Sequence, residues 1–358
     1  MAAMARLLPL LALAAALAGC SSDRRVPGRD SVAAGDAGGV PHLVQRSRTS
    51  MGSPIDLSAW TAREADAVAA FEAAFDEFDR LDGLLSVWRE GSDVLRLNAA
   101  AGRGAVTVSR DTLAVLKQAL QASEWTGGKF DVTFGALSDV WKFDHDQDDR
   151  IPSTSEIAAR LPLVDYRTIA LDEAAGTAQL KRAGARVHLG GVGKGYAVDR
   201  AVAILRSRGL TDFMVQSGGD LYVGGHQGNL PWRLGLRDPR GPADKIFATL
   251  ELSDATFSTS GDYERFFLRD GVRYHHLLDP DSGQPARGAR SVTIVAQTSV
   301  IADVLSTGVF VAGPEAGMAL IERLPDVEGV IVTAKNEVLI SSGLRSRLRL
   351  LAEPTDAP

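Results

Sequence analysis

Three features are few or missing in this chain: cysteine, an excess of positive charge and internal repetition. Cys20 is the only cysteine among 358 residues, which excludes an intramolecular disulfide and a thiol nucleophile deeper in the chain. Lys and Arg number 39 against 45 Asp and Glu, so the net charge of −6 gives no basic footprint for nucleic acid. No segment repeats at a fixed period, which excludes a repeat architecture. The 45% of hydrophobic residues is enough for one large domain or two fused modules.

Long apolar runs are also missing, apart from one at the N-terminus. Residues 7–17 form an apolar segment behind Arg6, too short to span a membrane as a mature helix but typical of a signal peptide. It ends in Leu17-Ala18-Gly19-Cys20, which resembles the lipobox of bacterial lipoproteins. The resemblance implies cleavage after Gly19 and lipidation of Cys20. An ordinary signal peptide followed by a chance cysteine is the alternative.

The ends of the chain are therefore predicted to lie outside the folded body. Residues 1–19 would be the signal peptide, and residues 20–40, rich in Gly, Arg, Asp, Ser and Ala, a lipidated cysteine with a flexible tether. The implied location is outside the cytoplasm, on a lipid anchor facing the periplasm; Ser21 favours the outer membrane by resemblance, and the inner membrane stays open. The body is predicted at residues 41–352, and residues 353–358 as a disordered tail.

Within the body, helices and strands mix without the regular alternation of a doubly wound sheet. Apolar residues at three- and four-residue steps predict a helix over residues 64–85. Further helices are predicted over residues 111–123 and 195–208, after a capping box at 153–156, and from about residue 300. Strands are predicted on both sides of a tight turn at 217–220, with short β segments over 232–294 and a hairpin over 329–341. The predicted fold class is α+β with a largely antiparallel β core.

A glycine loop at residues 190–195 connects a strand to a helix and contains Lys194. Such a loop is expected to expose backbone groups and a cation to a phosphate. It does not match the P-loop pattern, because Gly195 stands in place of Ser or Thr and His188 in place of glycine. It does not match the dinucleotide pattern either, because Tyr196 occupies the position of the third glycine. Taken alone, it could be a plain tight turn.

Far downstream, Asp303 and Thr307 are four residues apart in a predicted helix and therefore share one face. A carboxylate and a hydroxyl are hard oxygen ligands that suit a Mg²⁺ ion still carrying waters and phosphate oxygens. The alternative is a solvated aspartate and a threonine bonded back to its own helix. The loop and the helix together indicate metal-assisted chemistry on a phosphorylated cofactor.

Several other motifs stand in order along the chain: Gly-Gly-Lys-Phe-Asp at 127–131, Ser-Gly-Gly-Asp at 217–220, Ser-Thr-Ser-Gly-Asp-Tyr at 258–263 and His-Leu-Leu-Asp-Pro at 276–280. With the lysine loop and the Asp303 helix, they resemble the ApbE family, the FAD:protein FMN transferases. The resemblance runs from about Met51 to past Gly313. It implies an ApbE-like, T-fold-like architecture.

The resemblance also implies a role for individual residues. The side chains of Asp303 and Thr307 and the carbonyl of Gly191 would bind Mg²⁺, with Mn²⁺ as an alternative. His276 and Lys194 would be catalytic. The residues expected to contact FAD are Met51, Trp88, Lys129, Phe130, Asp131, Lys194, Ser260, Gly261 and His276. Lys129 departs from the family pattern, in which a small residue is more usual.

The implied reaction is transfer of FMN from FAD to a threonine hydroxyl of another protein, with release of AMP. Lys194 would neutralise charge on the flavin-side phosphate, and His276, with a reference pKa of about 6.5, would take the proton from the attacking hydroxyl. The family's acceptor motif, Ser/Thr-Gly-Ala-Ser/Thr-x-x-Thr, does not occur in this sequence, so the acceptor flavoprotein is another chain. An FAD pyrophosphatase that gives FMN and AMP, and a non-enzymatic flavin-binding lipoprotein, remain alternatives.

Some of these residues also have ordinary structural interpretations. Met51 and Trp88 would be plain core residues without the family resemblance. One of the adjacent His275 and His276 is expected to be structural, and His275 is the weaker candidate for the base. Residues 144–155 partly imitate an EF-hand loop, but the sixth and twelfth positions do not fit, which favours an acidic surface loop.

Overall fold

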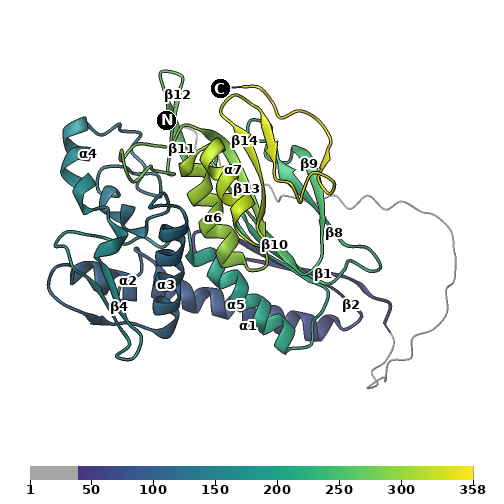
Figure 1. The fold of residues 1–358 in the computed structure, drawn as a ribbon. Coiled ribbons are helices and arrows are strands. Elements are labelled where there is room, and N and C mark those ends of the chain that lie inside the picture. The colour runs from purple at the N-terminus through teal and green to yellow at the C-terminus, as the bar shows by residue number, and fades with distance from the viewer. Residues whose placement is uncertain (1–38, 358) are drawn as a thin grey trace, which may run out of the picture.

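The computed structural model describes residues 39–357, so the predicted signal peptide and Cys20 lie outside the described part. Its main feature is an eight-stranded sheet in which every neighbouring pair is antiparallel (Figure 1). The strands, in spatial order, are β1 (His42–Ser50), β2 (Ser53–Thr61), β6 (Phe213–Ser217), β7 (Asp220–Gly224), β10 (Ala255–Gly261), β13 (Ala289–Ala296), β14 (Glu328–Thr333) and β15 (Val338–Ile340).

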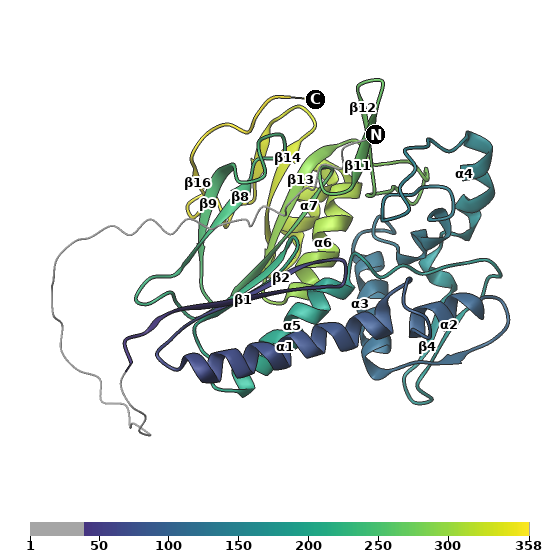
Figure 2. The same cartoon turned by 180° about the vertical axis from the view of Figure 1, so that it is seen from behind.

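Helices cover one face of this sheet. The long helix α1 (Glu64–Leu85) runs beneath β1 and β2, and α5 (Gly193–Ser207) and α6 (Ser299–Ala312) lie across the central strands, with α7 (Pro314–Arg323) beside β14 (Figures 1 and 2). The predicted helical face of α1 is confirmed, because Phe71, Phe75 and Phe78 are fully or almost fully buried in the core. Most of the buried apolar residues on the helical side of the sheet form one continuous cluster with these three phenylalanines.

A small second sheet covers the opposite face. It has the order β16-β9-β8, with β8 (Trp232–Arg237), β9 (Ile246–Leu252) and β16 (Arg349–Leu350). Trp232 and Phe247 from this sheet pack with Val295 and Val330 of the main sheet in a separate apolar cluster. The central strand β13 is therefore buried along its whole length, on both faces.

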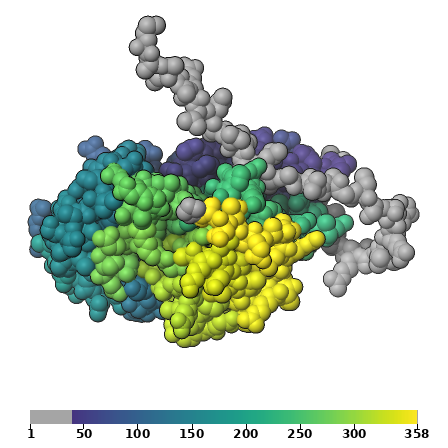
Figure 3. Space-filling view, turned by 90° about the horizontal axis from the view of Figure 1, so that it is seen from above, coloured from purple at the N-terminus to yellow at the C-terminus, as the bar shows by residue number. Residues whose placement is uncertain are grey.

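Shorter elements form the other end of the molecule, drawn in blue to teal in Figure 3. They are α2 (Asp93–Ala99), α3 (Arg110–Trp125), α4 (Thr154–Arg160), the short 3₁₀ helices η1 (Val132–Leu137), η2 (Leu161–Leu163) and η3 (Tyr166–Thr168), and a sheet of β3 (Val106–Thr107), β5 (Thr177–Leu180) and β4 (Ile169–Asp172). A hairpin of β11 (Phe266–Arg269) and β12 (Val272–His275) projects beside them (Figure 1).

The α+β class and the antiparallel core agree with the prediction, as do the capping box of α4 and the hairpin of β14 and β15. The helix predicted from about residue 300 is in fact two helices. Gly313, with φ of 85°, ends α6 and Pro314 begins α7, a stop-and-start pair that the apolar pattern alone did not reveal. The N-terminal hairpin of β1 and β2 was not predicted either.

The prediction of a disordered tail at residues 353–358 is wrong for the part that the structure describes. The Thr355 hydroxyl donates to Asp238 Oδ2 at 2.6 Å, and its backbone N–H donates to the same carboxylate. Arg290 pairs with Asp356 at 3.1 Å. Small polar residues suggested disorder, but they form hydrogen bonds and an ion pair with the folded body.

Among residues 39–357, no helix is both long and apolar enough to cross a membrane.

Candidate active site

A cleft of about 450 Å³ opens where the first turn of α5, the inner face of α6 and the end of β10 meet the loop after β12. Eleven of the twelve predicted site residues within residues 39–357 line it, far apart in sequence as they are: Trp88, Lys129, Phe130, Asp131, Gly191, Lys194, Ser260, Gly261, His276, Asp303 and Thr307. Met51 is the exception. It packs behind the glycine loop, where its Cε lies 3.6 Å from the position that a Cβ on Gly193 would take.

The glycine loop differs from the expected phosphate cradle, because most of its backbone amides bond within the protein. Gly190 N–H donates to His188 Nδ1 at 3.1 Å, and the amides of Val192 and Gly193 donate to Leu189 O. Gly195 N–H donates to the Asp303 carboxylate at 2.9 Å. What the loop offers to a ligand is therefore the Lys194 side chain and the exposed turn at Gly190 and Gly191, rather than a nest of free amides.

Lys194 reaches from the first turn of α5 to the start of β7. Its Nζ lies 3.1 Å from Asp220 Oδ2, and Asp220 Oδ1 accepts a hydrogen bond of 2.5 Å from Ser258. Burial opposes the charge on Lys194, but the nearby Asp220 and Asp303 carboxylates outweigh it and hold the lysine pKa above its ordinary value. Lys194 is therefore a permanent cation that faces the cleft.

Asp303 is 4% exposed and shares its surroundings with Asp220. Burial raises the pKa of the Asp303 carboxyl to about 7, and the charge of Asp220 adds to this, while Lys194 and the Gly195 amide act against it. An ionised Asp303 is therefore costly without a further positive charge close by. This is the electrostatic condition that a bound cation would relieve.

Thr307 and Gly191 lie beside Asp303 and offer two more oxygens. Thr307 follows Asp303 by one turn of α6, and its Oγ1 is 3.1 Å from Ser260 Oγ. A Cβ on Gly191 would lie 3.5 Å from Thr307 Oγ1, so the loop passes directly by the hydroxyl. Among residues 39–357, no group of three or more His, Cys, Asp or Glu side chains could hold a metal. A site here would consist of one carboxylate, one hydroxyl and one carbonyl.

The position of α6 is fixed by Asp199, which belongs to α5. The Asp199 carboxylate accepts hydrogen bonds from the backbone N–H groups of Ser299 (2.7 Å) and Val300 (3.0 Å), the first residues of α6. Burial raises the pKa of Asp199 to about 6, against the effect of these two hydrogen bonds. The same motif that carries Lys194 thus caps the helix that carries Asp303 and Thr307.

The two adjacent histidines have different environments. His275 is 2% exposed; its Nε2 donates to Ala286 O at 2.8 Å, and its Nδ1 accepts from Leu277 N–H. His276 lines the cleft, and among residues 39–357 only its Nδ1 has a hydrogen-bond partner, Arg265 O at 3.3 Å. Burial and the charge of Arg265 lower the pKa of His276 to about 3, so its ring is neutral. With a proton on Nδ1, the Nε2 lone pair of His276 is available as a base.

The opposite wall of the cleft is made from loops. Lys129 Nζ lies 2.9 Å from Asp279 Oδ1 and 2.8 Å from Asp281 Oδ2, so it joins the 127–131 segment to the loop after His276. Both carboxylate oxygens of Asp131 accept hydrogen bonds, from the backbone N–H groups of Thr133 and Tyr166. The predicted FAD contacts of Lys129 and Asp131 are thus side chains already engaged by the protein, although both residues line the cleft.

Aromatic side chains add to this wall. Trp88 is 52% exposed and stands edge-on to His145, with ring centroids 4.3 Å apart. Phe134, Trp141 and Phe143 also line the cleft. An exposed tryptophan at a cleft mouth is not an ordinary core residue, which excludes that interpretation for Trp88.

Sequence patterns missed two functional candidates. Arg265 pairs with Asp144 across the cleft mouth, and its carbonyl orients His276. His188, at the start of the glycine loop, lines the cleft beside Phe134. No sequence signal marks these contacts, since they join segments far apart in the chain.

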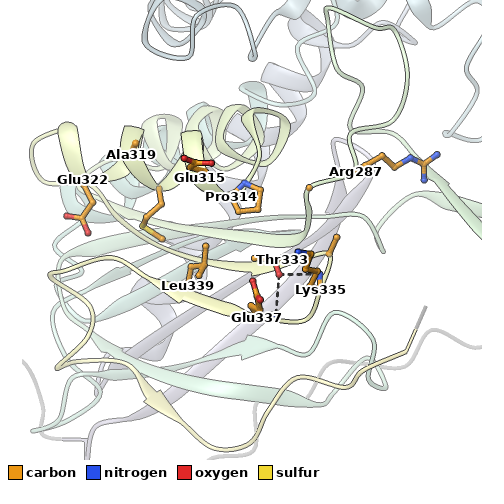
Figure 4. Close-up of a pocket in the computed structure, with 12 residues that line it drawn as sticks. Arg287, Pro314, Glu315, Ala319, Glu322, Thr333, Lys335, Glu337 and Leu339 are labelled. Carbon is orange, nitrogen blue, oxygen red and sulfur yellow. Dashed lines mark hydrogen bonds between the residues drawn. The ribbon is translucent and has the colours of Figure 1, made fainter.

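A second hollow, of about 700 Å³, lies between α7 and the hairpin of β14 and β15 (Figure 4). Its sides carry charges of both signs, such as Glu315 and Lys335, with Met318 and Leu339 among its apolar residues. None of the predicted site residues lines it, so the smaller cleft is the candidate active site in spite of the difference in volume.

Comparison with known proteins places this chain in a family. Residues 51–331 match the ApbE family. The FAD:protein FMN transferase of Treponema pallidum is 34% identical over 88% of this chain and 92% of its own length, and that of Klebsiella pneumoniae is 33% identical over 83% and 91%.

Solved structures agree with the sequence matches. The ApbE protein of Thermotoga maritima has a TM-score of 0.79 at 32% identity, and the flavin transferase ApbE of Vibrio cholerae one of 0.78 at 27%. Each match covers 86% of this chain and 99% of the solved chain. The chain belongs to the ApbE family.

Proposed function

We propose that this protein transfers FMN from FAD to a threonine hydroxyl of an acceptor flavoprotein and releases AMP. The observation that carries the proposal is the convergence of Lys194, Asp303 and His276 on one cleft from three distant segments. The arrangement supplies a cation for phosphate, hard oxygen ligands for a metal and a neutral imidazole for a proton. Relatives of 33–34% identity bear the name of this activity.

The residues at the inner end of the cleft fit a Mg²⁺ ion, and Mn²⁺ would use the same donors. Asp303 supplies a carboxylate whose charge is unfavourable by itself, Thr307 a hydroxyl and Gly191 a carbonyl. Bound Mg²⁺ supplies charge neutralisation at the pyrophosphate of FAD. Asp220 is committed to Lys194 and Ser258, which leaves Asp303 as the carboxylate for the ion.

The chain's own residues account for orientation and proton transfer. Lys194 holds the flavin-side phosphate by its charge, at a position that Asp220 fixes. The threonine oxygen attacks the phosphorus of the FMN phosphoryl group, and the bond from that phosphorus to the bridging oxygen breaks. AMP leaves with the electron pair of that bond, and the threonine proton passes to His276 Nε2. The anionic pyrophosphate favours the imidazolium formed there, which offsets the low pKa of the free enzyme.

The acceptor and the location belong to the same proposal. The acceptor carries the Ser/Thr-Gly-Ala-Ser/Thr-x-x-Thr motif and docks outside the cleft, with its threonine inserted. A lipid on Cys20 would hold the enzyme at a bacterial membrane facing the periplasm, where exported flavoproteins are accessible. The sequence resemblance to a lipobox is what supports this part.

The test uses the full-length protein in detergent with FAD, MgCl₂ and a substrate protein that carries the acceptor motif. Intact mass of the substrate and release of AMP are measured together. An FMN-sized mass gain with equal AMP, absent in EDTA, supports the transferase. AMP without a mass gain, with several acceptor sequences, would instead indicate the pyrophosphatase. Flavin binding with neither product would indicate a carrier.

The role of His276 needs its own test. We expect His276→Gln to lower the transfer rate about 100-fold or more while FAD still binds, because the proton acceptor is lost. His275→Gln is an unsuitable comparison, since both nitrogens of that ring hold backbone groups. His226→Gln, on an exposed turn, is the matched control. Unchanged turnover in His276→Gln would remove the base assignment without affecting the transferase.

A further inference from the structure

His188 is a cleft residue without an assigned role. Its backbone is fixed on both sides: the N–H of His188 donates to Val132 O at 2.8 Å, and Val187 exchanges two hydrogen bonds with the Asn98 side chain, of 2.8 and 3.0 Å. These contacts join the segment to η1 and α2. The side chain therefore starts from a rigid position at the cleft wall.

The orientation of the ring is fixed as well. Gly190 N–H donates to His188 Nδ1 at 3.1 Å, and a Cβ on Gly190 would come within 2.8 Å of the ring carbon Cε1. The ring thus packs directly over the glycine loop, and a Cβ at position 190 would push the ring out of this place. Because Nδ1 accepts a hydrogen bond in the neutral ring, the proton must lie on Nε2. His188 is a donor at Nε2 and nothing else.

That donor has no partner in the described chain. Among residues 39–357, no hydrogen bond to His188 Nε2 is found, and the residue lines the cleft. Its ring lies 5.4 Å from that of Phe134, at an angle of 45°. Burial lowers the pKa of His188, against the opposing charge of Asp144, so the ring stays neutral and is poorly suited to a phosphate. Lys194 is the cation for that group.

We propose that His188 is a specificity-determining residue that donates its Nε2–H to an acceptor atom on the edge of a planar heteroaromatic ring of FAD. The proposal rests on the proposed function, which makes FAD the ligand of this cleft. The ring stacks in the compartment formed by Phe134 and the neighbouring aromatic side chains. Flavin and adenine both have such acceptor atoms, so the shared chemistry is a planar ring with an acceptor edge.

Two substitutions separate the contact from support of the glycine loop. In His188→Asn, the amide oxygen can replace Nδ1 as acceptor for Gly190 N–H, but no donor reaches the position of Nε2. In His188→Gln, the amide nitrogen reaches that position, but the acceptor for Gly190 is lost. The same two changes at exposed His226 serve as matched controls.

The experiment is calorimetric titration of the full-length protein in detergent with FAD, FMN, riboflavin and AMP. We expect His188→Asn to bind FAD about five- to tenfold more weakly, the loss of one hydrogen bond, and His188→Gln to stay within about twofold of the parent. Weaker binding of FMN and riboflavin, with AMP unchanged, would assign the flavin ring; the reverse would assign adenine. Both outcomes support the contact.

Other outcomes would overturn it. If His188→Asn binds all four ligands like the parent, or if only His188→Gln binds weakly, His188 supports the loop and touches no ligand. If the parent binds no FAD, the proposed function itself fails. As a check without mutation, the parent protein with ¹⁵N-labelled histidine should show a ring with a proton on Nε2 whose signal shifts with FAD. No shift of any such signal would contradict the proposal.

Discussion

The two walls of the cleft hold their charges in different ways. On the wall of α5 and α6, Asp220 is 1% and Asp303 4% exposed, and each charge depends on Lys194 or on backbone N–H groups. On the loop wall, Lys129 pairs with Asp279 and with Asp281, whose side chain is 77% exposed. The charges of the buried wall carry a desolvation cost, whereas those of the loop wall remain partly hydrated.

This difference suggests that the two walls have different functions, the buried wall in bond breaking and the loop wall in forming the opening of the cleft. A desolvated carboxylate interacts strongly with a cation or phosphate, so the α5–α6 wall suits bond breaking. The exposed ion pairs of the loop wall contribute little energy but join the segments that frame the opening. We therefore expect substitutions on the buried wall to change rates strongly and those on the loop wall to change them slightly.

The largest effect is expected for Asp303→Asn. The amide keeps the shape and its oxygen can still accept from Gly195 N–H, but the charge for the cation is lost, so turnover should fall about 100- to 1,000-fold at saturating FAD. Steady-state AMP release over a Mg²⁺ titration measures this. Asp326→Asn, on an exposed turn, is the control. A loss below tenfold would contradict the importance of the buried wall.

The protonation of the buried carboxyl groups should contribute to the pH dependence of the stability of the metal-free protein. The raised pKa values of Asp303 (about 7) and Asp199 (about 6) mean that these two groups bind more protons in the folded than in the unfolded chain above about pH 4, so their contribution to the free energy of unfolding falls as the pH rises to about 7. The buried histidines act in the opposite direction, because burial lowers the pKa of His275 to about 4 and that of His276 to about 3. The contribution of Asp303 is therefore measured as the difference between the parent and Asp303→Asn, by thermal unfolding in EDTA from pH 5 to 7.5.

Two comparisons isolate this contribution. The stability of the parent relative to Asp303→Asn should fall as the pH rises from 5 to 7.5 in EDTA, and Mg²⁺ should stabilise the parent more at pH 7.5 than at pH 5, because the ion needs the ionised carboxylate. Asp238, with its pKa lowered to about 2, acts in the opposite direction to Asp303, but only at lower pH. The same pH dependence in the parent and in Asp303→Asn would contradict the assignment.

A smaller effect is expected for a substitution of Asp199, which connects α5 to the start of α6 within the buried wall. Asp199→Asn leaves one side-chain acceptor for the two N–H groups at the start of α6, so it should destabilise the fold by about 1 kcal/mol. Because α6 carries Asp303 and Thr307, we also expect weaker Mg²⁺ binding. Chemical denaturation and metal titration measure both quantities. Asp66→Asn, exposed in the first turn of α1, should change neither.

The smallest effect is expected on the loop wall. Lys129→Met removes two partly exposed ion pairs, which should cost less than about 1 kcal/mol and change KM for FAD by about two- to fivefold with kcat nearly unchanged. Lys117→Met, which removes an exposed pair with Glu173, is the matched control. A loss of more than tenfold in kcat would contradict this and would show that Lys129 acts in the chemical step.

Local patterns predicted those elements whose signal is local. The 22 residues of α1 were evident from their apolar spacing, and Asp303 and Thr307 from their separation by one turn. The strands β1 and β2 were not, because β1 is an edge strand with mostly exposed side chains and lacks clear alternation. The tail at residue 355 was mistaken for disorder because its partner, Asp238, is 117 residues away.

The sequence by itself determined the family, the α+β class and the residues that form the cleft, because ordered motifs and apolar periodicity are written along the chain. Only the tertiary structure decided how these residues work. It distinguished His276 from His275 through their backbone partners, and it brought His188 to the cleft wall. It also showed that most backbone amides of the glycine loop form hydrogen bonds within the protein. The physical reason is that burial and hydrogen bonding between distant segments set the charge and orientation of each side chain.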